Sequence, residues 1–594
     1  MNASRDTPTA RSNRAPGAVS DRAPAPGKSR AFWLLVGLML CGHAGLAFDC
    51  ARRLTVTHDE YWHLPVGLLN LSEGRFHFDN LNPPLVRAWA ALPLFLSGER
   101  IHLENADADA FEIGDIFVSS VGERYDRLYA VSRSMIVILS VLTGVVIAVW
   151  ARQWFGDAAA LLATLLWSTS PTFLMSASLV TTDLGAALFF VATLYLLWRF
   201  AGQPTWRNAS LFGLCLGLAQ LAKFTSILLY PLAIVLWFAV RIGNDEINKG
   251  NRGGNLSKWG VALLLSLFVL NAGYLFQGSF SAFESFQFGS KALSKLSGLQ
   301  EPLGGVPVPF PRDYVEGVDR QRHIMESAHP VYLDGQLQVE GFPHYNLMAV
   351  WYKIPHATQL FIVLTALFLV MPGGKRRLLR RQLVLLLPVA LLFLIASGSG
   401  MQLGIRYLLP VLPFLVLFAG QSARWFDRKQ YPARCVMIAV LAVLTPLSVR
   451  FHPHHLAYFN ELAGGPVNGH AHLIDSNIDW GQDLRGLKHY VDENNINKIG
   501  LAYFGMLPPS ELGIDYFIPW RQTDVVPSRQ AVKPGWYAIS TNFLMGRPHT
   551  IREPDGTVGQ VGPHEFGVFR TLKPRARIGY SIFIYHVPER PGVR

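Results

Sequence analysis

Two adjacent carboxylates, Asp59 and Glu60, follow directly on the first long apolar run of the chain. A carboxylate at a membrane surface can take a proton from a hydroxyl nucleophile, which is general base catalysis. In a helix, Asp59 shares a face with His63 at spacing i, i+4, whereas Glu60 points about 100° away from Asp59. The two acids then cannot serve as the same base, so we expect one of them to be structural. The alternative for the pair is a solvated helix end or cap.

A third acid, Asp183, is the only one in a short polar connection that precedes another apolar run. It could cap that helix, or it could be functional, because ionisable groups at the lip of a membrane span are rare. Asn82-Pro83-Pro84 begins a segment of apolar residues with Arg87, which predicts an amphipathic helix at the membrane interface. Arg87 could pair with a lipid phosphate or simply snorkel toward water.

Three cations, Lys223, Lys353 and Arg406, lie at the ends of apolar runs, and Tyr407 follows the last of them. Snorkelling explains each cation singly. Together with the three acids they indicate one outward-facing pocket that carries both signs of charge. Such a pocket suits a phosphate or diphosphate leaving group together with a general base.

The same residues give little indication of a metal site. A zincin motif, His-Glu-x-x-His, needs a histidine where the chain has Asp59. The four cysteines lie in or beside apolar runs without a C-x-x-C pair, which predicts neither a disulfide framework nor a cysteine metal site. We therefore assign no metal ligands and no certain cofactor, and a divalent metal stays open as a possibility.

Composition indicates a membrane protein. Half of the 594 residues are hydrophobic and 16% are charged, compared with about 25% charged residues in soluble domains. The net charge of +12 comes largely from Lys and Arg in short loops between apolar runs. The positive-inside rule explains this placement, and no basic stripe interleaved with aromatics indicates nucleic-acid binding.

Eleven apolar runs are predicted to span the membrane. They lie near residues 31–49, 129–150, 158–176, 182–200, 208–222, 224–241, 258–277, 354–371, 383–398, 404–421 and 435–449. A single long, tilted helix over 208–241 is the alternative for the weakest pair. With eleven spans all strongly basic short loops fall on one side, whereas ten would place the cluster at 375–381 on the other.

This topology divides the chain into three parts. Residues 1–30 are predicted to be a disordered cytoplasmic tail, and residues 31–449 a transmembrane module with outer loops at about 50–128 and 278–353. Residues 450–594 are predicted to be an extracytoplasmic soluble domain. The expected fold is a polytopic α-helical membrane protein with about 11 transmembrane helices and this C-terminal domain.

The C-terminal domain shows mixed patterns. Residues 483–494 are typical of a helix and residues 498–504 and 535–540 of strands, which predicts an α/β fold. Residues 475–483 space their side-chain oxygens like a calcium loop, but Trp480 stands where that loop needs Gly. Capping of the following helix is the favoured interpretation, and binding of an acceptor by the same acids is the other.

An ordered set of motifs resembles the GT-C membrane glycosyltransferases, in the branch of the protein O-mannosyltransferases and the lipid A aminoarabinose transferase. The motifs extend over about residues 31–421. They are Asp59-Glu60, Asn82-Pro83-Pro84-Leu85, Asp183 and Arg406-Tyr407-Leu408-Leu409-Pro410.

The resemblance implies roles for single residues. Asp59 matches the family's catalytic base, and Asp183 matches an important acid of the second outer loop. Asn82 stands where the family commonly has His, Lys or Glu, which is a departure. Arg87 occupies the place of a family lysine and keeps its charge.

The resulting hypothesis is an inverting glycosyltransferase of the bacterial inner membrane. The donor would be a sugar on a polyprenyl-phosphate carrier, and the acceptor a hydroxyl of a protein, a lipid or a glycan outside the cytoplasm. We expect partial burial to raise the pKa of Asp59 toward a value useful for a base. The competing hypotheses are a transporter or flippase, and a structural subunit of an envelope complex. The expected site consists of the catalytic residues Asp59, Glu60 and Asp183 and the substrate-binding residues His63, Asn82, Arg87, Lys223, Lys353, Arg406 and Tyr407.

Overall fold

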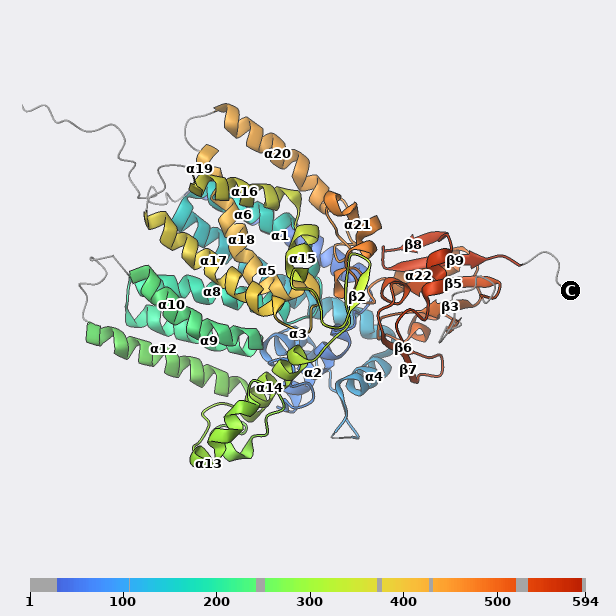
Figure 1. The fold of residues 1–594 in the computed structure, drawn as a ribbon, viewed down its shortest axis with the longest axis horizontal. Coiled ribbons are helices and arrows are strands. Elements are labelled where there is room, and N and C mark those ends of the chain that lie inside the picture. The colour runs from blue at the N-terminus through green and yellow to red at the C-terminus, as the bar shows by residue number, and fades with distance from the viewer. Residues whose placement is uncertain are drawn as a thin grey trace, which may run out of the picture.

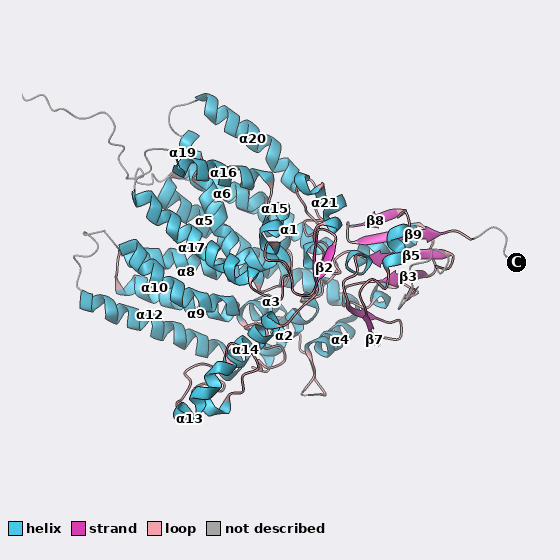
Figure 2. Cartoon of the chain, in the orientation of Figure 1, coloured by secondary structure: helices cyan, strands magenta, loops and turns pink. Residues whose placement is uncertain are grey.

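The computed structural model describes residues 29–105, 107–241, 252–370, 376–426, 431–519 and 532–589. In these residues a bundle of long helices carries a small, sheet-containing domain at one end (Figures 1 and 2). The N-terminal tail that was predicted to be disordered lies outside the described residues, apart from its last two positions. The predicted fold class, a helical membrane protein with a C-terminal α/β domain, is confirmed.

Each of the eleven predicted spans contains a helix. The helices of the bundle are α1 (Arg30–Arg53), α5 (Tyr125–Phe155), α6 (Asp157–Thr169), α7 (Pro171–Ala177), α8 (Asp183–Gly202), α9 (Trp206–Ala222), α10 (Leu229–Arg241), α12 (Arg252–Gly273), α16 (His356–Val370), α17 (Arg376–Ser397), α18 (Leu412–Gly420) and α20 (Tyr431–Val449). Among the described residues, five helices are long and apolar enough to cross a membrane, or seven if each sharply bent helix pair forms one span. The count of eleven stays a prediction.

The alternative of one long helix over 208–241 is wrong. α9 ends at Ala222, and Lys223 is extended, with φ −162° and ψ 141°. A short 3-10 turn, η2 (Phe224–Leu228), then leads into α10. Since Lys223 pairs with Asp183 at the start of α8, the break places a cation at the end of the bundle where α8 begins.

Three short helices lie at this end of the bundle (Figure 1). They are α2 (Glu60–Ser72), α3 (Leu85–Leu96) and α4 (Ala110–Val121). α3 begins directly after Pro84 and buries Arg87, which confirms the helix expected after the double proline. A later connection contributes α14 (Arg312–Glu326), the hairpin of β1 (Val331–Leu333) and β2 (Gln336–Gln338), and α15 (Tyr345–Lys353).

The C-terminal domain is built on a mixed five-stranded sheet with the strand order β4-β3-β5-β9-β8. The strands are β3 (Ile499–Ala502), β4 (Tyr516–Phe517), β5 (Gly535–Ser540), β8 (Ala576–Ile578) and β9 (Ile582–Val587). β3 runs parallel to both β4 and β5, and β9 runs antiparallel to β5 and β8. The predicted strands at 498–504 and 535–540 and the predicted helix at 483–494, which is α22 (Leu484–Glu493), are confirmed.

Lys353 fastens the C-terminal segment to the bundle. Its ammonium group donates to the carbonyl oxygen of Leu456 at 2.8 Å and to that of Asn477 at 2.6 Å, and the residue is 2% exposed. A buried ammonium needs such acceptors, because a charge without partners is costly away from water. Lys353 therefore has a docking role at the base of the domain.

Replacing Lys353 by Met should lower the thermal unfolding midpoint of the detergent-solubilised protein. Two buried carbonyl oxygens lose a charged donor, which should cost about 2–4 kcal/mol. Differential scanning fluorimetry measures the midpoint. Lys498→Met is the matched control, since Lys498 is an exposed lysine that pairs with Asp515 on the surface. Equal midpoints for the two variants would contradict the docking role.

Candidate active site

A cavity of about 290 Å³ lies where α2, α8, α14, α17 and the 3-10 segment η5 (Gly404–Val411) meet. One part of its wall is polar and the other is apolar. The polar part is formed by His58, Asp59, His63, Asp79, Asn82, Thr182, Lys223, Gln321 and Arg406. The apolar part includes Phe224, Ile324, Met325, Leu392, Ile395, Ala396 and Leu403. The cavity therefore suits a molecule with a polar head and an apolar chain.

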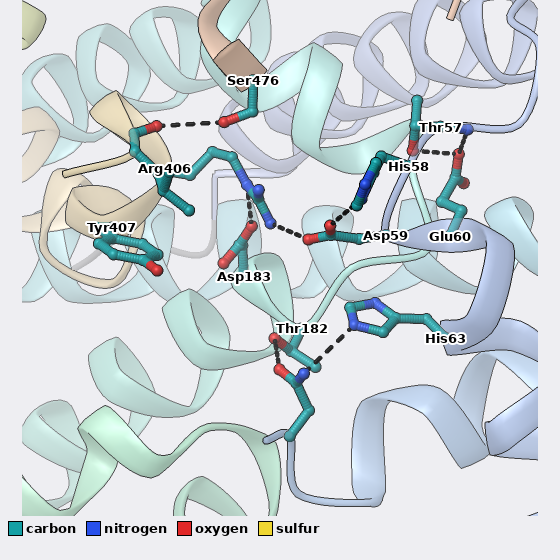
Figure 3. Close-up of polar contacts among 12 residues, drawn as sticks. Thr57, His58, Asp59, Glu60, His63, Thr182, Asp183, Arg406, Tyr407 and Ser476 are labelled. Carbon is teal, nitrogen blue, oxygen red and sulfur yellow. Dashed lines mark hydrogen bonds and ion pairs between the residues drawn. The ribbon is translucent and has the colours of Figure 1, made fainter. Parts of the chain in front are cut away.

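The centre of the polar part is an arginine held between two acids. Arg406 donates from Nε to Oδ2 of Asp183 at 3.0 Å and from Nη2 to Oδ2 of Asp59 at 2.9 Å (Figure 3). Asp59 precedes α2 and Asp183 begins α8, so the arginine connects segments that lie far apart in the sequence. Within the described part of the chain we find no hydrogen bond from Nη1 of Arg406, and this nitrogen can still bind an anion.

A second cation, Lys223, lies beside these residues, and we call Asp59, Asp183, Lys223 and Arg406 the charge cluster. Lys223, at the break between α9 and α10, pairs with Oδ1 of Asp183. Its ammonium lies 5.6 Å from the ring centre of Tyr407, whose hydroxyl donates to the sulfur of Met401. The predicted residues Asp59, Lys223, Arg406 and Tyr407 thus all line one cavity, and Asp183, outside the lining, pairs with both cations.

The pKa of Asp59 lies below its ordinary value. Burial acts to raise it, but the nearby charge of Arg406 and the hydrogen bond from His58 lower it by more. The expectation of a raised pKa was wrong, because it counted burial and not the arginine that the fold brings alongside. Asp59 is consequently a carboxylate that stays ionised as long as Arg406 holds it.

Glu60 does not line the cavity. Its carboxylate accepts from Nε and Nη2 of Arg133 at 2.8 and 2.7 Å and from the backbone nitrogen of Val180 at 2.7 Å. Arg133 also donates to three carbonyl oxygens between residues 51 and 55. Burial tends to raise the pKa of Glu60, but Arg133 and these donors lower it overall. Of the adjacent acids, Glu60 thus has the contacts of a structural residue that fixes the loop before α2.

Arg87 holds the wall of the cavity without lining it. Its guanidinium donates to Oδ2 of Asp79 at 2.7 Å and to the carbonyl of Asn82 at 2.6 Å. Nδ2 of Asn82 lies 3.4 Å from Nε2 of His63, and Oδ1 of Asn82 accepts from the hydroxyl of Thr182 at 3.2 Å. Arg87 is 1% exposed, so it orients the loop at 79–82. Lys353, likewise buried, lies outside the cavity.

Sequence reasoning missed several contributors. His58 lies 3.4 Å from Asp59, Arg133 holds Glu60, and the ring of Trp480 faces Arg406. His58 stood beside the predicted base and could have been included, but nothing in the sequence indicates which elements Arg133 and Trp480 approach. The predicted capping role of the acids at 475–483 is wrong for Asp483, whose carboxylate makes no cap hydrogen bond to α22 and accepts from Ser581 instead.

Metal-ligating side chains are not grouped in this site. Over the described ranges, no three or more His, Cys, Asp or Glu side chains are placed to hold one metal ion. Both Asp59 and Asp183 are engaged by Arg406.

Residues 129–270 match the family model of dolichyl-phosphate-mannose-protein mannosyltransferases. The matched segment contains Asp183 and Lys223 of the charge cluster, and it runs from α5 into α12. The predicted resemblance to membrane glycosyltransferases of this type is therefore confirmed in this segment. No sequence among curated proteins matches the chain.

Solved structures of membrane glycosyltransferases are similar at a low level. ArnT from Cupriavidus metallidurans bound to undecaprenyl phosphate is 13% identical, with a TM-score of 0.47, over 94% of this chain and 98% of that one. The archaeal oligosaccharyltransferase AglB from Archaeoglobus fulgidus is 12% identical, with a TM-score of 0.47, over 90% and 74%. The S. cerevisiae Pmt1-Pmt2 complex is 16% identical, with a TM-score of 0.32, over 43% and 34%.

Glu60→Gln should destabilise the protein strongly, because it leaves the Arg133 charge buried without its partner. Breaking a buried pair in this way costs about 3–5 kcal/mol. The thermal unfolding midpoint in detergent measures the loss. Glu73→Gln is the matched control at the other end of α2, where the pair with Arg75 is half-exposed and is worth about 0–1 kcal/mol. A midpoint for Glu60→Gln as high as that of the control would refute the structural role.

Proposed function

We propose that the protein is an inverting glycosyltransferase that moves a sugar from a polyprenyl-phosphate carrier to an acceptor hydroxyl. The observation that carries the proposal is the Arg406 bridge between Asp59 and Asp183, with Asp59 and Arg406 lining a cavity whose wall also includes apolar side chains of α14 and α17. In this proposal Asp59 serves as the base, Arg406 and Lys223 bind the phosphate, and the apolar wall of the same cavity takes the lipid chain. The matching family is named for a donor of this class, a mannose on dolichyl phosphate.

The donor phosphate would bind at Arg406 and Lys223. Both cations line the cavity, and Nη1 of Arg406 can still donate to an anion. The prenyl chain would follow the apolar wall of α14 and α17. On α17, Leu392 and Ile395 face the cavity, while Leu394 between them is 73% exposed on the outside of the bundle. This helix therefore separates the cavity from the lipid side, where a long chain can leave.

The chemistry would be a direct displacement at the anomeric carbon. Asp59 takes the proton of the acceptor hydroxyl, the acceptor oxygen bonds to the anomeric carbon, and the bond to the phosphate oxygen breaks. The transition state resembles an oxocarbenium ion, as in glycoside chemistry. The two cations stabilise the charge that develops on the leaving phosphate. When the phosphate binds Arg406, its negative charge offsets the charge that lowers the pKa of Asp59. The pKa of Asp59 then rises, and the carboxylate becomes a better base.

We further propose the cellular placement of this reaction. The site lies at the end of the bundle that carries the C-terminal domain (Figure 1), and the positive-inside pattern puts that end outside the cytoplasm. A bacterial inner membrane is the proposed location. The acceptor would be a protein, lipid or glycan hydroxyl that reaches the cavity from the side of the C-terminal domain.

Asp59→Asn should abolish transfer while leaving the protein folded. Loss of a general base typically lowers rates by about 100- to 10,000-fold. The measurement is sugar transfer or release by purified protein in liposomes, with a panel of polyprenyl-phosphate sugars. Asp107→Asn, an exposed acid in the same connection, is the control and should retain full activity. Full activity of Asp59→Asn would move the base elsewhere, and no turnover with any donor would favour transport or assembly.

The rate should show no acid limb from Asp59 between pH 5 and 7. The folded-state pKa of Asp59 is lowered, so the carboxylate is ionised down to values below its ordinary pKa of about 3.9. The stability that this shift contributes is present above that ordinary value and is lost as the pH falls through the lower folded-state pKa. Arg406→Gln removes the opposing charge, so burial should raise the pKa and an acid limb should appear at higher pH.

The residual activity of Arg406→Gln is measured as kcat/KM from pH 4.5 to 8 beside the wild type. An acid limb with the same midpoint in both proteins would contradict the assignment, because the titrating group would then be independent of Arg406.

A further inference from the structure

The segment 475–483 of the C-terminal domain lies against the cavity. Two backbone hydrogen bonds join it to the loop before α2, from the nitrogen of Thr55 to the oxygen of Gln482 and from the nitrogen of His58 to the oxygen of Trp480, each 2.9 Å long. On the other side, Ser476 donates to the carbonyl of Leu403 at 3.2 Å. The segment is thus fastened both to the loop that carries Asp59 and to the chain just before Arg406.

Trp480 lies at the middle of this segment and is 3% exposed. Its ring centre is 3.7 Å from Cζ of Arg406, so the indole faces the guanidinium. At the edge of the same guanidinium, Nε and Nη2 donate hydrogen bonds to the two acids. Arg406 is therefore constrained on its edge by Asp59 and Asp183 and on its face by a residue of the C-terminal domain.

We infer that Trp480 is a positioning residue, through which the C-terminal domain completes the active site. Trp480 is not among the side chains that line the cavity, so it acts through Arg406 rather than on the substrate. The inference rests on the proposed function and assigns a role in it to the segment 475–483.

The physical reason is the planar shape of the guanidinium. A planar fork can bridge two carboxylates only in one orientation, and an aromatic face against it limits rotation out of that plane. Stacking of this kind also stabilises the cation itself. Without the ring, Arg406 could turn toward one acid alone, and both the phosphate site and the ionisation of Asp59 would change.

The competing explanation is packing alone. Trp480 belongs to an apolar cluster that also contains Leu54, Met175 and Phe504, so its loss would disturb the core in any case. Substitutions that keep an apolar side chain but differ in aromatic character separate the two explanations. Trp480→Phe keeps a π face toward Arg406, and Trp480→Leu does not.

The test is a double-mutant cycle between Trp480→Leu and Arg406→Gln, with Trp480→Phe beside it. Transfer should fall about 2- to 30-fold in Trp480→Leu, which is the range of a cation–π contact, and less in Trp480→Phe. In the Arg406→Gln background, Trp480→Leu should have little further effect. An acid limb of kcat/KM should appear in Trp480→Leu, whereas Trp480→Phe, like the wild type, should show none between pH 5 and 7.

The control is Trp536→Leu in the same domain. The ring centre of Trp536 lies 5.9 Å from Cζ of Arg575, and Trp536 does not line the cavity, so its loss should leave transfer and its pH dependence unchanged. Equal rates for Trp480→Leu and Trp480→Phe would overturn the inference. So would a loss in Trp480→Leu that is just as large in the Arg406→Gln background.

Thermal unfolding midpoints of the wild type, Trp480→Leu, Arg406→Gln and the double variant provide a readout that does not need turnover. If the midpoint shifts of the two single variants do not add up to that of the double variant, Trp480 and Arg406 interact in the folded protein. If this coupling appears while no donor supports transfer in the wild type, the proposed function fails but the contact stands. If transfer occurs and neither readout shows coupling, the proposed function stands and the role of Trp480 is refuted.

Discussion

The guanidinium of Arg406, held between Asp59 and Asp183, is the interaction on which the site depends. Charged groups at the boundary of an apolar bundle are costly unless they are paired with good geometry. Here one planar cation meets carboxylates from the loop before α2 and from the start of α8. The position of η5 relative to both segments follows from this pairing, and so does the ionised state of Asp59.

Further buried ion pairs and anchors surround that bridge and fix the backbone on which it is built. Arg133 ties Glu60 to the end of α1, and Arg87 of α3 ties the loop at 79–82 to its own helix. Their charges face protein groups and leave the cavity to Arg406 and Lys223. The division explains how a site with many ionisable residues keeps only a few of them available for substrate.

The C-terminal domain takes part in the same arrangement. Its segment 475–483 forms backbone hydrogen bonds with the loop that carries Asp59, and Trp480 faces Arg406. A transmembrane module alone would leave this guanidinium open on one side.

The sequence by itself determined the helical membrane class, the positions of the apolar helices, the α/β character of the C-terminal domain and most of the charged residues of the site. Periodicity, composition and the placement of Asp59, Asp183 and Arg406 are local properties that the chain displays directly. Only the tertiary structure decided which acid pairs with which arginine or lysine, and which ring faces Arg406. Arg133 and Trp480 reach their partners from other segments of the chain. It also reversed the expected pKa of Asp59, since a nearby charge outweighs burial and no sequence pattern records that distance.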